Sequence, residues 1–222
     1  VVDLPVCSSS RSADCFTTGE IETLTAIYEG PITNGHQLFP GQPLGAEMGG
    51  GWTNWIVSDN RPTIGFRFSE AFFKYLAFTP DEPDFDWHTF NFNTDPDRVT
   101  IRTILDATAP DLSAFHARGG KMITYFGWAD AALNPIMGVN YYEKIEASLG
   151  AETTSEFYRL FMVPGMFHCG GGLGTDQFDA ITPLINWVEN GIPPDTIPAA
   201  RVEAGAVTRT RPLCPHPKIA TY

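Results

Sequence analysis

Two segments in the second half of the chain each combine a short apolar run with a longer amphipathic pattern. In the first, residues 121–126 form an apolar and β-branched run that predicts a buried strand of a parallel sheet. Asn134-Pro135 then marks a helix start, because proline is favoured at the first helical position, and Gly150 marks the helix end. The apolar side chains between them recur at helical spacing: Ile136, Val139, Tyr142, Ile145 and Leu149.

The second segment repeats this plan. Residues 157–163 predict another strand, and a loop is expected from Pro164 to Gly174. We expect Thr175 or Asp176 to cap the next helix and Asn190-Gly191 to end it. Its apolar positions are Phe178, Ile181, Leu184, Ile185 and Val188. Two successive strand-loop-helix units indicate an α/β fold with a parallel sheet.

An acidic side chain and an imidazole follow the two predicted strands. Asp130 ends the sequence Phe-Gly-Trp-Ala-Asp, and His168 lies in Gly-Met-Phe-His-Cys. Open α/β sheets bind ligands beyond the carboxyl ends of their strands, so both side chains are expected at the functional edge. A carboxylate beside an imidazole holds it in the tautomer that a hydroxyl nucleophile needs from its general base. The order Asp then His is that of the last two triad members of an α/β-hydrolase.

Other interpretations of this pair remain open. Asp130 can be the cap of the following helix and His168 a structural loop histidine, or the two can be ligands of a catalytic metal. No Gly-x-Ser-x-Gly turn occurs in the 222 residues, and none of the serines present lies in a sharp strand-to-helix turn. The sequence therefore predicts an Asp and a His of a triad without its nucleophile.

The first half of the chain has a different character. Residues 17–20, Thr-Thr-Gly-Glu, form a capping-box pattern, and the helix that they start is expected to end at Gly30-Pro31. Residues 33–96 are rich in Gly, Pro and aromatic residues and show little periodicity before residues 70–76. Such irregular segments are typically lids or binding loops. Their aromatic side chains either line a pocket for an aromatic acid or pack the lid itself: Trp52, Trp55, Phe66, Phe68, Phe72, Phe73, Trp87, Phe90 and Phe92.

Composition narrows the range of partners. The chain is 43% hydrophobic and 13% aromatic, which is enough for a packed core. Its net charge of −12, with only 14 Lys and Arg, argues against binding nucleic acid or an anionic membrane, because both need clustered basic residues. No apolar stretch approaches the length of a membrane span.

Four cysteines allow three pairings, and their spacing does not choose among them. Cys7 and Cys15 bracket a short Ser-rich loop, so a local disulfide is one option. Free buried thiols, or a zinc site that includes His168, are the others. Zinc is disfavoured because no Cys-x-x-Cys spacing occurs.

Several motifs together resemble the tannase and feruloyl esterase family of serine esterases. The resemblance covers nearly the whole chain, and its most specific element is the His168-Cys169 pair with its Gly-Gly-Gly continuation. The other matching motifs are Gly-Trp-Ala-Asp130, Asn186-Trp-Val-Glu189, Thr210-Arg-Pro-Leu-Cys-Pro215, Asp14-Cys-Phe-Thr17 and Tyr28-Glu-Gly-Pro31.

The resemblance implies roles for individual residues. It supports a Cys7–Cys15 disulfide, and it pairs Cys169 with a cysteine that directly precedes the nucleophilic serine. Neither that cysteine nor that serine is in this sequence, and the mate of Cys214 is expected beyond it as well. Leu133 resembles a position that faces the substrate. The calcium of the family is structural, and its binding loop belongs to sequence that this chain lacks.

We therefore expect residues 1–96 to be the remainder of an irregular lid domain and residues 97–222 to be the C-terminal part of an α/β-hydrolase core. The expected function is hydrolysis of esters of aromatic acids, of the feruloyl esterase or tannase type. Asp130 and His168 are the expected catalytic residues, and the serine is expected on missing or partner sequence. No cofactor is expected to take part in the chemistry.

The expected partner is a small aromatic ester. Two explanations of the missing residues stay open: the chain is one half of a processed enzyme, with the N-terminal half as a disulfide-linked partner, or it is a piece of a longer polypeptide. This chain alone is expected to be inactive, and the enzyme to be secreted or periplasmic. The alternative function is that of a secreted, non-catalytic module that binds aromatic or carbohydrate ligands through its aromatic segment.

Overall fold

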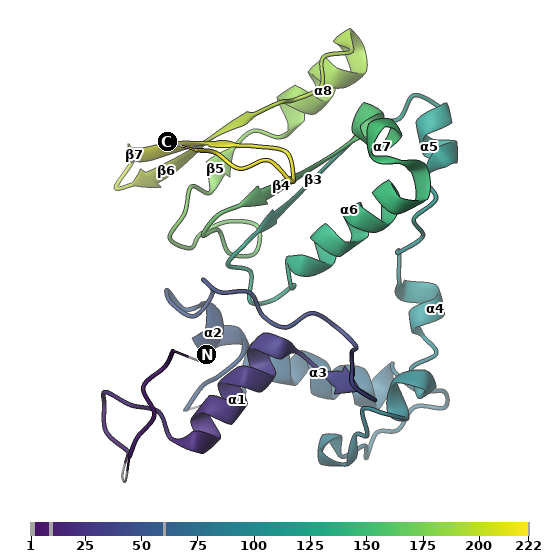
Figure 1. The fold of residues 1–222 in the computed structure, drawn as a ribbon. Coiled ribbons are helices and arrows are strands. Elements are labelled where there is room, and N and C mark those ends of the chain that lie inside the picture. The colour runs from purple at the N-terminus through teal and green to yellow at the C-terminus, as the bar shows by residue number, and fades with distance from the viewer. Residues whose placement is uncertain (1–2, 9–10, 60, 222) are drawn as a thin grey trace. The chain divides into compact units, whose positions relative to one another are not determined.

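The computed structural model describes residues 3–8, 11–59 and 61–221, and the chain divides into two compact units. One comprises Val1–Leu44 with Glu70–Ile101, and the other comprises Gly45–Ser69 with Arg102–Tyr222 (Figure 1). Residues 45–69, which the sequence predicts to be part of the lid, thus cluster with the unit that contains Asp130 and His168. The lid role of residues 1–96 stays a prediction.

In the first unit, helix α1 (Thr18–Glu29) starts and ends where the sequence predicts. The Thr17 hydroxyl accepts a hydrogen bond from the Glu20 amide, and the Glu20 carboxylate accepts one from the Thr17 amide at 2.8 Å. This reciprocal pair is a capping box, which satisfies two amides that the helix itself leaves unpaired. A short antiparallel pair follows, β1 (Ile32–Thr33) with β2 (His36–Gln37).

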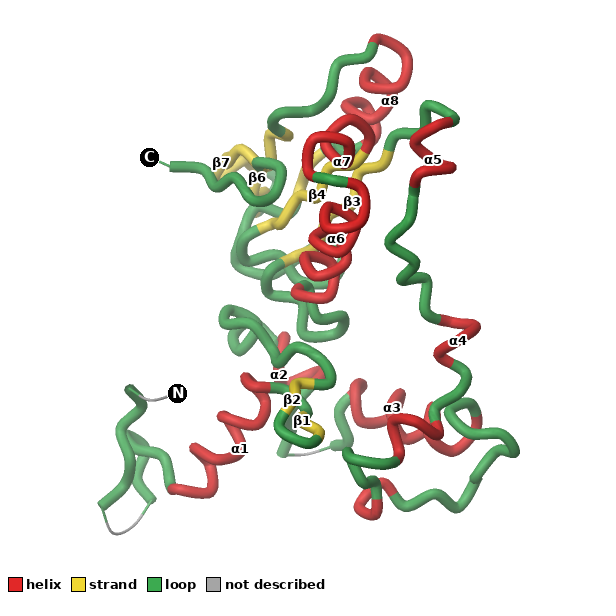
Figure 2. The backbone as a smooth tube through the Cα atoms, turned by 45° about the vertical axis from the view of Figure 1, so that its right-hand side comes forward, coloured by secondary structure: helices red, strands yellow, loops and turns green. Residues whose placement is uncertain are grey.

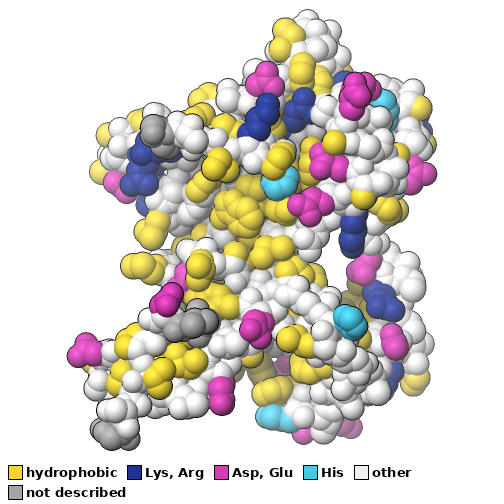
Figure 3. Space-filling model, in the orientation of Figure 1, with side chains coloured by type: hydrophobic (Ala, Val, Ile, Leu, Met, Phe, Trp, Pro, Cys, Tyr) yellow, Lys and Arg dark blue, Asp and Glu magenta, His cyan; other side chains and the backbone are white. Residues whose placement is uncertain are grey.

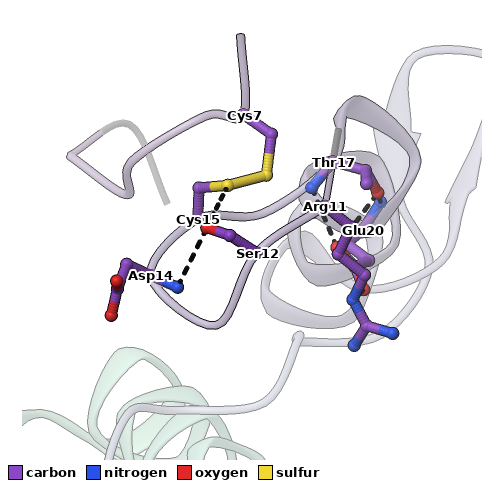
Figure 4. The surroundings of a disulfide bond; sticks show 7 residues. All are labelled: Cys7, Arg11, Ser12, Asp14, Cys15, Thr17 and Glu20. Atoms are coloured by element: carbon purple, nitrogen blue, oxygen red, sulfur yellow. Dashed lines mark hydrogen bonds and ion pairs between the residues drawn. A yellow bond between two sulfur atoms is a disulfide. The ribbon is translucent and has the colours of Figure 1, made fainter. Parts of the chain in front are cut away.

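The turn before α1 is closed by a disulfide between Cys7 and Cys15, one of the pairings that the sequence left open (Figure 4). Ser12 lies inside this small loop, where its hydroxyl is 3.3 Å from the Cys15 sulfur and accepts a hydrogen bond from the Asp14 amide. The disulfide therefore fixes the chain directly before the capping box of α1.

The irregular segment has more helix than its sequence indicates. Helix α2 covers Gly51–Trp55, and α3 (Ile64–Tyr75) begins six residues before the periodic stretch at Glu70. The 3₁₀ turns η1 (Trp87–Thr89) and η2 (Asp95–Arg98) follow. In the first unit, the Phe73 ring lies 5.5 Å from Phe85 and 5.0 Å from Phe90, centroid to centroid. These rings pack one another, as the second of the two interpretations of the aromatic residues predicts.

The second unit is built on two parallel strands, β3 (Met122–Gly127) and β4 (Tyr158–Val163), which pair from Met122↔Tyr158 to Gly127↔Val163. Helix α6 (Ile136–Leu149) connects them and ends at Gly150, as predicted. Helix α7 (Ala151–Phe157) was not predicted, and it delays the second strand by one residue. Two further short helices, α4 (Arg102–Leu105) and α5 (Ser113–Ala117), precede β3. The unit therefore contains the predicted parallel βαβ arrangement.

Alternate residues of β4 face two different cores. Tyr158 and Leu160 pack with Tyr142 and Ile145 of α6, on the face that α6 and α7 cover. Phe161 and Val163 point to the other face and pack against the second sheet, which contains Ile197, Ala199 and Leu213. Because both faces of β4 are covered, its sequence is almost continuously apolar, as is usual for parallel strands.

The second sheet is antiparallel and has the order β5 (Gln177–Phe178), β6 (Ile197–Glu203), β7 (Ala206–Leu213). Strands β6 and β7 of this sheet are labelled in Figure 2. Helix α8 (Ile181–Asn190) follows β5 and ends at Gly191 in the left-handed conformation, as predicted. Its predicted start at Thr175 or Asp176 is wrong, because Gln177 and Phe178 pair with Ala200 and Ala199 of β6. Phe178 is therefore a strand residue, and the Asp179 carboxylate accepts the first helical amides instead.

Candidate active site

Asp130 and His168 lie in the loops that leave the carboxyl ends of β3 and β4, the two neighbouring strands of the parallel sheet. The loops are joined by main-chain hydrogen bonds from Trp128 to Val163 (2.9 Å) and from Ala129 to Met166 (3.0 Å). Since both loops start at one sheet edge and bond to each other there, their two side chains are brought together.

Gly127 makes this close approach of the loops possible. A Cβ atom at residue 127 would lie 2.2 Å from the Met166 carbonyl oxygen and 2.5 Å from that of Phe167. Both distances are far below van der Waals contact, and both neighbouring atoms belong to the main chain. Only glycine fits at the end of β3 without displacing the loop that holds His168.

The Asp130 carboxylate is buried, with 2% of the residue exposed. Its Oδ2 lies 2.8 Å from His168 Nδ1. Its Oδ1 accepts hydrogen bonds from the amides of Ala132 (2.8 Å) and Leu133 (2.9 Å). One oxygen therefore receives two fixed main-chain donors, which leaves the other directed at the imidazole.

The His168 side chain is 46% exposed, so its ring lies between the buried carboxylate and the surface. Because Asp130 accepts at Nδ1, this arrangement favours the tautomer with a proton on Nδ1 and a lone pair on Nε2. Among the described residues, no hydrogen-bond partner of Nε2 is present, and no serine hydroxyl is bonded to His168. The ring is thus oriented as a general base whose free nitrogen can accept a proton from a further group.

The loop beyond His168 turns through residues with unusual backbone angles. Cys169 has φ 62°, and Gly171 and Gly172 have φ 75° and 85°. The Gly171 amide donates to the Asp176 carboxylate at 2.8 Å. Asp176 therefore supports this loop, whereas the sequence around it predicted only a helix cap.

The other predicted site residues have definite places. Leu133 is 47% exposed, and its main-chain amide donates a hydrogen bond to the Asp130 carboxylate. Cys169 is exposed and Cys214 half-buried, and both are free thiols in the structure. In the described part of the chain, no group of three or more His, Cys, Asp or Glu side chains is arranged to hold a metal ion.

The sequence profile of tannase and feruloyl esterase matches residues 2–222. The chain belongs to this family. A mono(2-hydroxyethyl) terephthalate hydrolase of Piscinibacter sakaiensis is 36% identical over 97% of the chain. An uncharacterized esterase of Xanthomonas campestris pv. campestris is 33% identical over 98% of it.

Solved structures show the same fold. The crystal structure of an esterase from Aspergillus oryzae matches 96% of the chain with a TM-score of 0.82 and 26% identity. That of feruloyl esterase B from the same organism gives a TM-score of 0.81 at 23% identity, also over 96% of the chain. These two solved structures are thus of esterases, and they share the mixed helix and strand fold of the chain.

The chain spans less than half the length of these proteins. It covers 41% of the Piscinibacter hydrolase, 45% of the Xanthomonas esterase and 45% of the first Aspergillus structure. The similarity therefore concerns one large part of the relatives, and it is in this part that Asp130 and His168 meet.

Proposed function

We propose that this chain supplies the aspartate and the histidine of the triad of a serine carboxylesterase. The observation that supports this most directly is the 2.8 Å contact between the buried Asp130 carboxylate and His168 Nδ1 at the ends of two adjacent parallel strands. A second His–carboxylate pair, His88 with Asp86, lacks this setting, since both of its side chains are more than half exposed. Burial of the carboxylate distinguishes a rigid catalytic pair from a surface ion pair.

The chemistry follows from the direction of the ring. A serine hydroxyl at Nε2 of His168 would transfer its proton to the imidazole while its oxygen attacks the ester carbonyl. The imidazolium, stabilised by Asp130, would then protonate the leaving alcohol, which leaves an acyl-enzyme. In the second half of the cycle the same nitrogen would activate water, and the carboxylic acid would be released with the serine restored.

The proposed substrates are esters of aromatic carboxylic acids, such as hydroxycinnamates and gallates. The names of the relatives support this class: one hydrolyses mono(2-hydroxyethyl) terephthalate and another is a probable feruloyl esterase. We assign Leu133 a contact with the substrate, because its exposed side chain lies three residues from the catalytic carboxylate.

The nucleophilic serine is proposed to lie on sequence outside this chain, so the chain alone would be inactive. Two features of the described residues support a missing neighbour. Strand β3 pairs only with β4 among them, which leaves its other edge as a row of main-chain groups that a further strand can pair with. Helix α8 exposes the apolar side chains of Ile181, Ile185 and Val188, and apolar groups also reach the surface on the face drawn in Figure 3.

We propose that Cys169 and Cys214 form disulfides with cysteines outside this chain: the bond of Cys169 would join it to the N-terminal half of the enzyme, and the mate of Cys214 would lie beyond residue 222. An oxidising location, outside the cell or in the periplasm, agrees with the Cys7–Cys15 disulfide. No helix in the described part of the chain is long and apolar enough to cross a membrane. No cofactor is proposed for the chemistry, and the calcium of the family is assigned to sequence outside this chain.

The test is the His168→Ala variant of the complete enzyme, compared with His88→Ala. Both changes remove an imidazole whose Nδ1 contacts a carboxylate, at 2.8 Å for His168 and 2.6 Å for His88. We expect His168→Ala to lose nearly all hydrolysis of methyl ferulate, methyl gallate and mono(2-hydroxyethyl) terephthalate while keeping its far-UV circular dichroism. His88→Ala should keep normal turnover. Near-normal activity of His168→Ala would show that the assignment is wrong.

The location of the serine is tested by the intact mass of the unreduced sample before and after reduction. Release of a second polypeptide would support a two-chain esterase, and a serine-directed phosphonate should then label that partner. If the complete enzyme hydrolyses these esters but no phosphonate adduct forms on any of its serines, the serine mechanism is overturned.

A further inference from the structure

The loop that presents His168 is unusually rich in glycine. Five of the ten residues from Gly165 to Gly174 are glycine. Gly165, Gly170, Gly171 and Gly172 have positive φ. Glycine loses more conformational freedom on folding than any other residue, so a loop of this composition needs firm anchors to hold a side chain in one place.

The two limbs of this loop are anchored in different ways. The outgoing limb, which leads from β4 through Met166 to His168, is bound to the Asp130 loop through main-chain hydrogen bonds, including that from the Ala129 amide to the Met166 carbonyl at 3.0 Å. The returning limb, residues 171–174, depends on side chains from outside the loop as well as on its bonds to Gly165. The limbs meet beside the catalytic histidine, where the Phe167 amide donates to the Gly171 carbonyl at 3.3 Å. A shift of the returning limb would therefore reach His168 directly.

Two arginines of the β6–β7 hairpin bind the carbonyl groups of the returning limb. Arg201 Nη1 donates to the carbonyl oxygens of Gly172 and, at 3.3 Å, of Gly174. Arg209 Nη1 donates to the Leu173 carbonyl oxygen at 3.3 Å. Three consecutive carbonyls of the limb thus receive guanidinium donors, and hydrogen bonds to charged donors are stronger than neutral ones.

These arginines are direct cross-strand neighbours, since Arg201 pairs with Arg209 in the register of β6 and β7. Like charges at directly opposed positions destabilise a sheet. The carbonyls of the limb offset this repulsion, as does Glu203, whose carboxylate lies 3.2 Å from Arg201 Nε. The Arg201 side chain is only 22% exposed, whereas Arg209 is exposed, so Arg201 is the stronger anchor.

We propose that Arg201 is a positioning residue for the catalytic base: its guanidinium fixes the returning limb and thereby keeps the His168 ring on the Asp130 carboxylate. The kinetic part of this proposal rests on the proposed esterase function. The structural part concerns only the tautomer and orientation of the imidazole, which can be measured in this chain without any turnover.

The first experiment uses the chain itself with ¹⁵N-labelled histidine. The nitrogen chemical shifts of His168 distinguish a proton on Nδ1 from a proton on Nε2. We expect the parent chain to hold the Nδ1–H tautomer at alkaline pH, and Arg201→Gln to show averaging between the two tautomers. Arg201→Lys should keep an intermediate share of the Nδ1–H form, because an ammonium group can bind one carbonyl but lacks the forked guanidinium.

Two variants serve as controls. Glu203→Gln removes the ion-pair partner of Arg201 but leaves the guanidinium free to bind the loop. Arg118→Gln removes a guanidinium that also binds a main-chain carbonyl, that of Ala114 at 3.1 Å, in α5. Both should keep the parental nitrogen shifts. If Arg201→Gln does not fold, Arg201→Lys and the milder Arg209→Gln supply the comparison.

The second experiment measures turnover in the complete enzyme. A displacement of about 1 Å in a catalytic group can lower the rate about 100-fold, so we expect Arg201→Gln to lower kcat by about 10- to 100-fold with little change in KM. A purely stabilising role would lower the melting temperature and leave kcat per folded molecule unchanged.

The two experiments separate the proposals. An unaltered Nδ1–H signature in the Arg201 variants that fold, together with parental kcat, overturns the positioning role. A reduced share of the Nδ1–H form in these variants, with the controls unchanged, supports it even if the complete parent enzyme hydrolyses no ester. That last result would refute the esterase function without affecting the role of Arg201.

Discussion

Exchange of Asp130 for asparagine should reverse the tautomer of His168. In the native chain one carboxylate oxygen accepts from the amides of Ala132 and Leu133, while the other faces Nδ1 of the histidine. An asparagine at residue 130 would keep its carbonyl oxygen on the two main-chain donors. Its NH₂ group would then point at Nδ1, which would have to become an acceptor and leave the proton on Nε2.

The magnitude follows from the two main-chain bonds. If the amide of this asparagine turned so that its oxygen faced His168, both main-chain hydrogen bonds would be lost, at about 1 kcal/mol each. The orientation that gives the wrong tautomer is therefore favoured roughly 30-fold. In serine proteases the same Asp-to-Asn exchange leaves the geometry intact and lowers kcat about 10⁴-fold. We expect a loss of this size in the complete enzyme, equivalent to about 5 kcal/mol in the activation free energy.

Asp179→Asn provides a matched control. The Asp179 carboxylate also accepts from the amides two and three residues ahead, those of Ile181 (2.8 Å) and Thr182 (3.0 Å), but no histidine that the structure describes is hydrogen-bonded to it. The assay compares kcat of both variants with the parent and records the melting temperature and the ¹⁵N shifts of His168. Asp179→Asn should show parental kcat and parental shifts.

This prediction is wrong if His168 keeps its proton on Nδ1 in Asp130→Asn. It is also wrong if Asp130→Asn and Asp179→Asn both have a kcat within about 10-fold of that of the parent. A large loss of melting temperature without a change of tautomer would likewise contradict it, because Asp130 would then act only by holding its own loop through the amides of Ala132 and Leu133.

Three further predictions follow from single residues. Leu133→Ala should raise KM for aromatic esters severalfold with little effect on kcat, as steady-state kinetics would show; unchanged KM would exclude a substrate contact. Gly127→Ala should destabilise the chain by about 1–3 kcal/mol in urea unfolding and lower activity, because its Cβ would meet the Met166 carbonyl at 2.2 Å; full stability would contradict the close approach. Burial raises the pKa of Tyr142 to about 12 in the folded chain. Because the unfolded chain loses this phenolic proton at a lower pH than the folded chain, the free energy of unfolding should fall between about pH 10 and 12, by no more than about 3 kcal/mol. Tyr142→Phe should flatten this alkaline decline, and an unchanged decline would refute it.

Local signals in the sequence were sufficient for the elements that depend on local interactions. The capping box at Thr17 and Glu20, the start of α6 at Asn134-Pro135 and the ends at Gly150 and Gly191 lie where predicted. The two parallel strands were also predictable from their apolar and β-branched runs, although only β4 is largely buried on both faces.

Elements that depend on distant pairing were not predictable in the same way. Gln177 and Phe178 fit a helical pattern, yet they pair with β6, and only this pairing delays α8 to Ile181. Asp176, the expected helix cap, instead binds the Gly171 amide. In each case a contact with a distant or non-helical segment took the place of the helical role that the local sequence predicts.

The same division applies to the candidate site. The sequence alone was enough to select Asp130 and His168 as candidates, since each follows an apolar run that predicts a strand, and the carboxyl ends of parallel strands lie at one edge of a sheet. The three-dimensional packing was needed to show that their atoms meet at 2.8 Å, that the carboxylate is buried, and that Arg201 binds the loop at Gly172, 29 positions earlier in the chain. The physical reason is that orientation and burial arise from packing between segments distant in sequence, whereas strand, cap and turn signals act over a few residues.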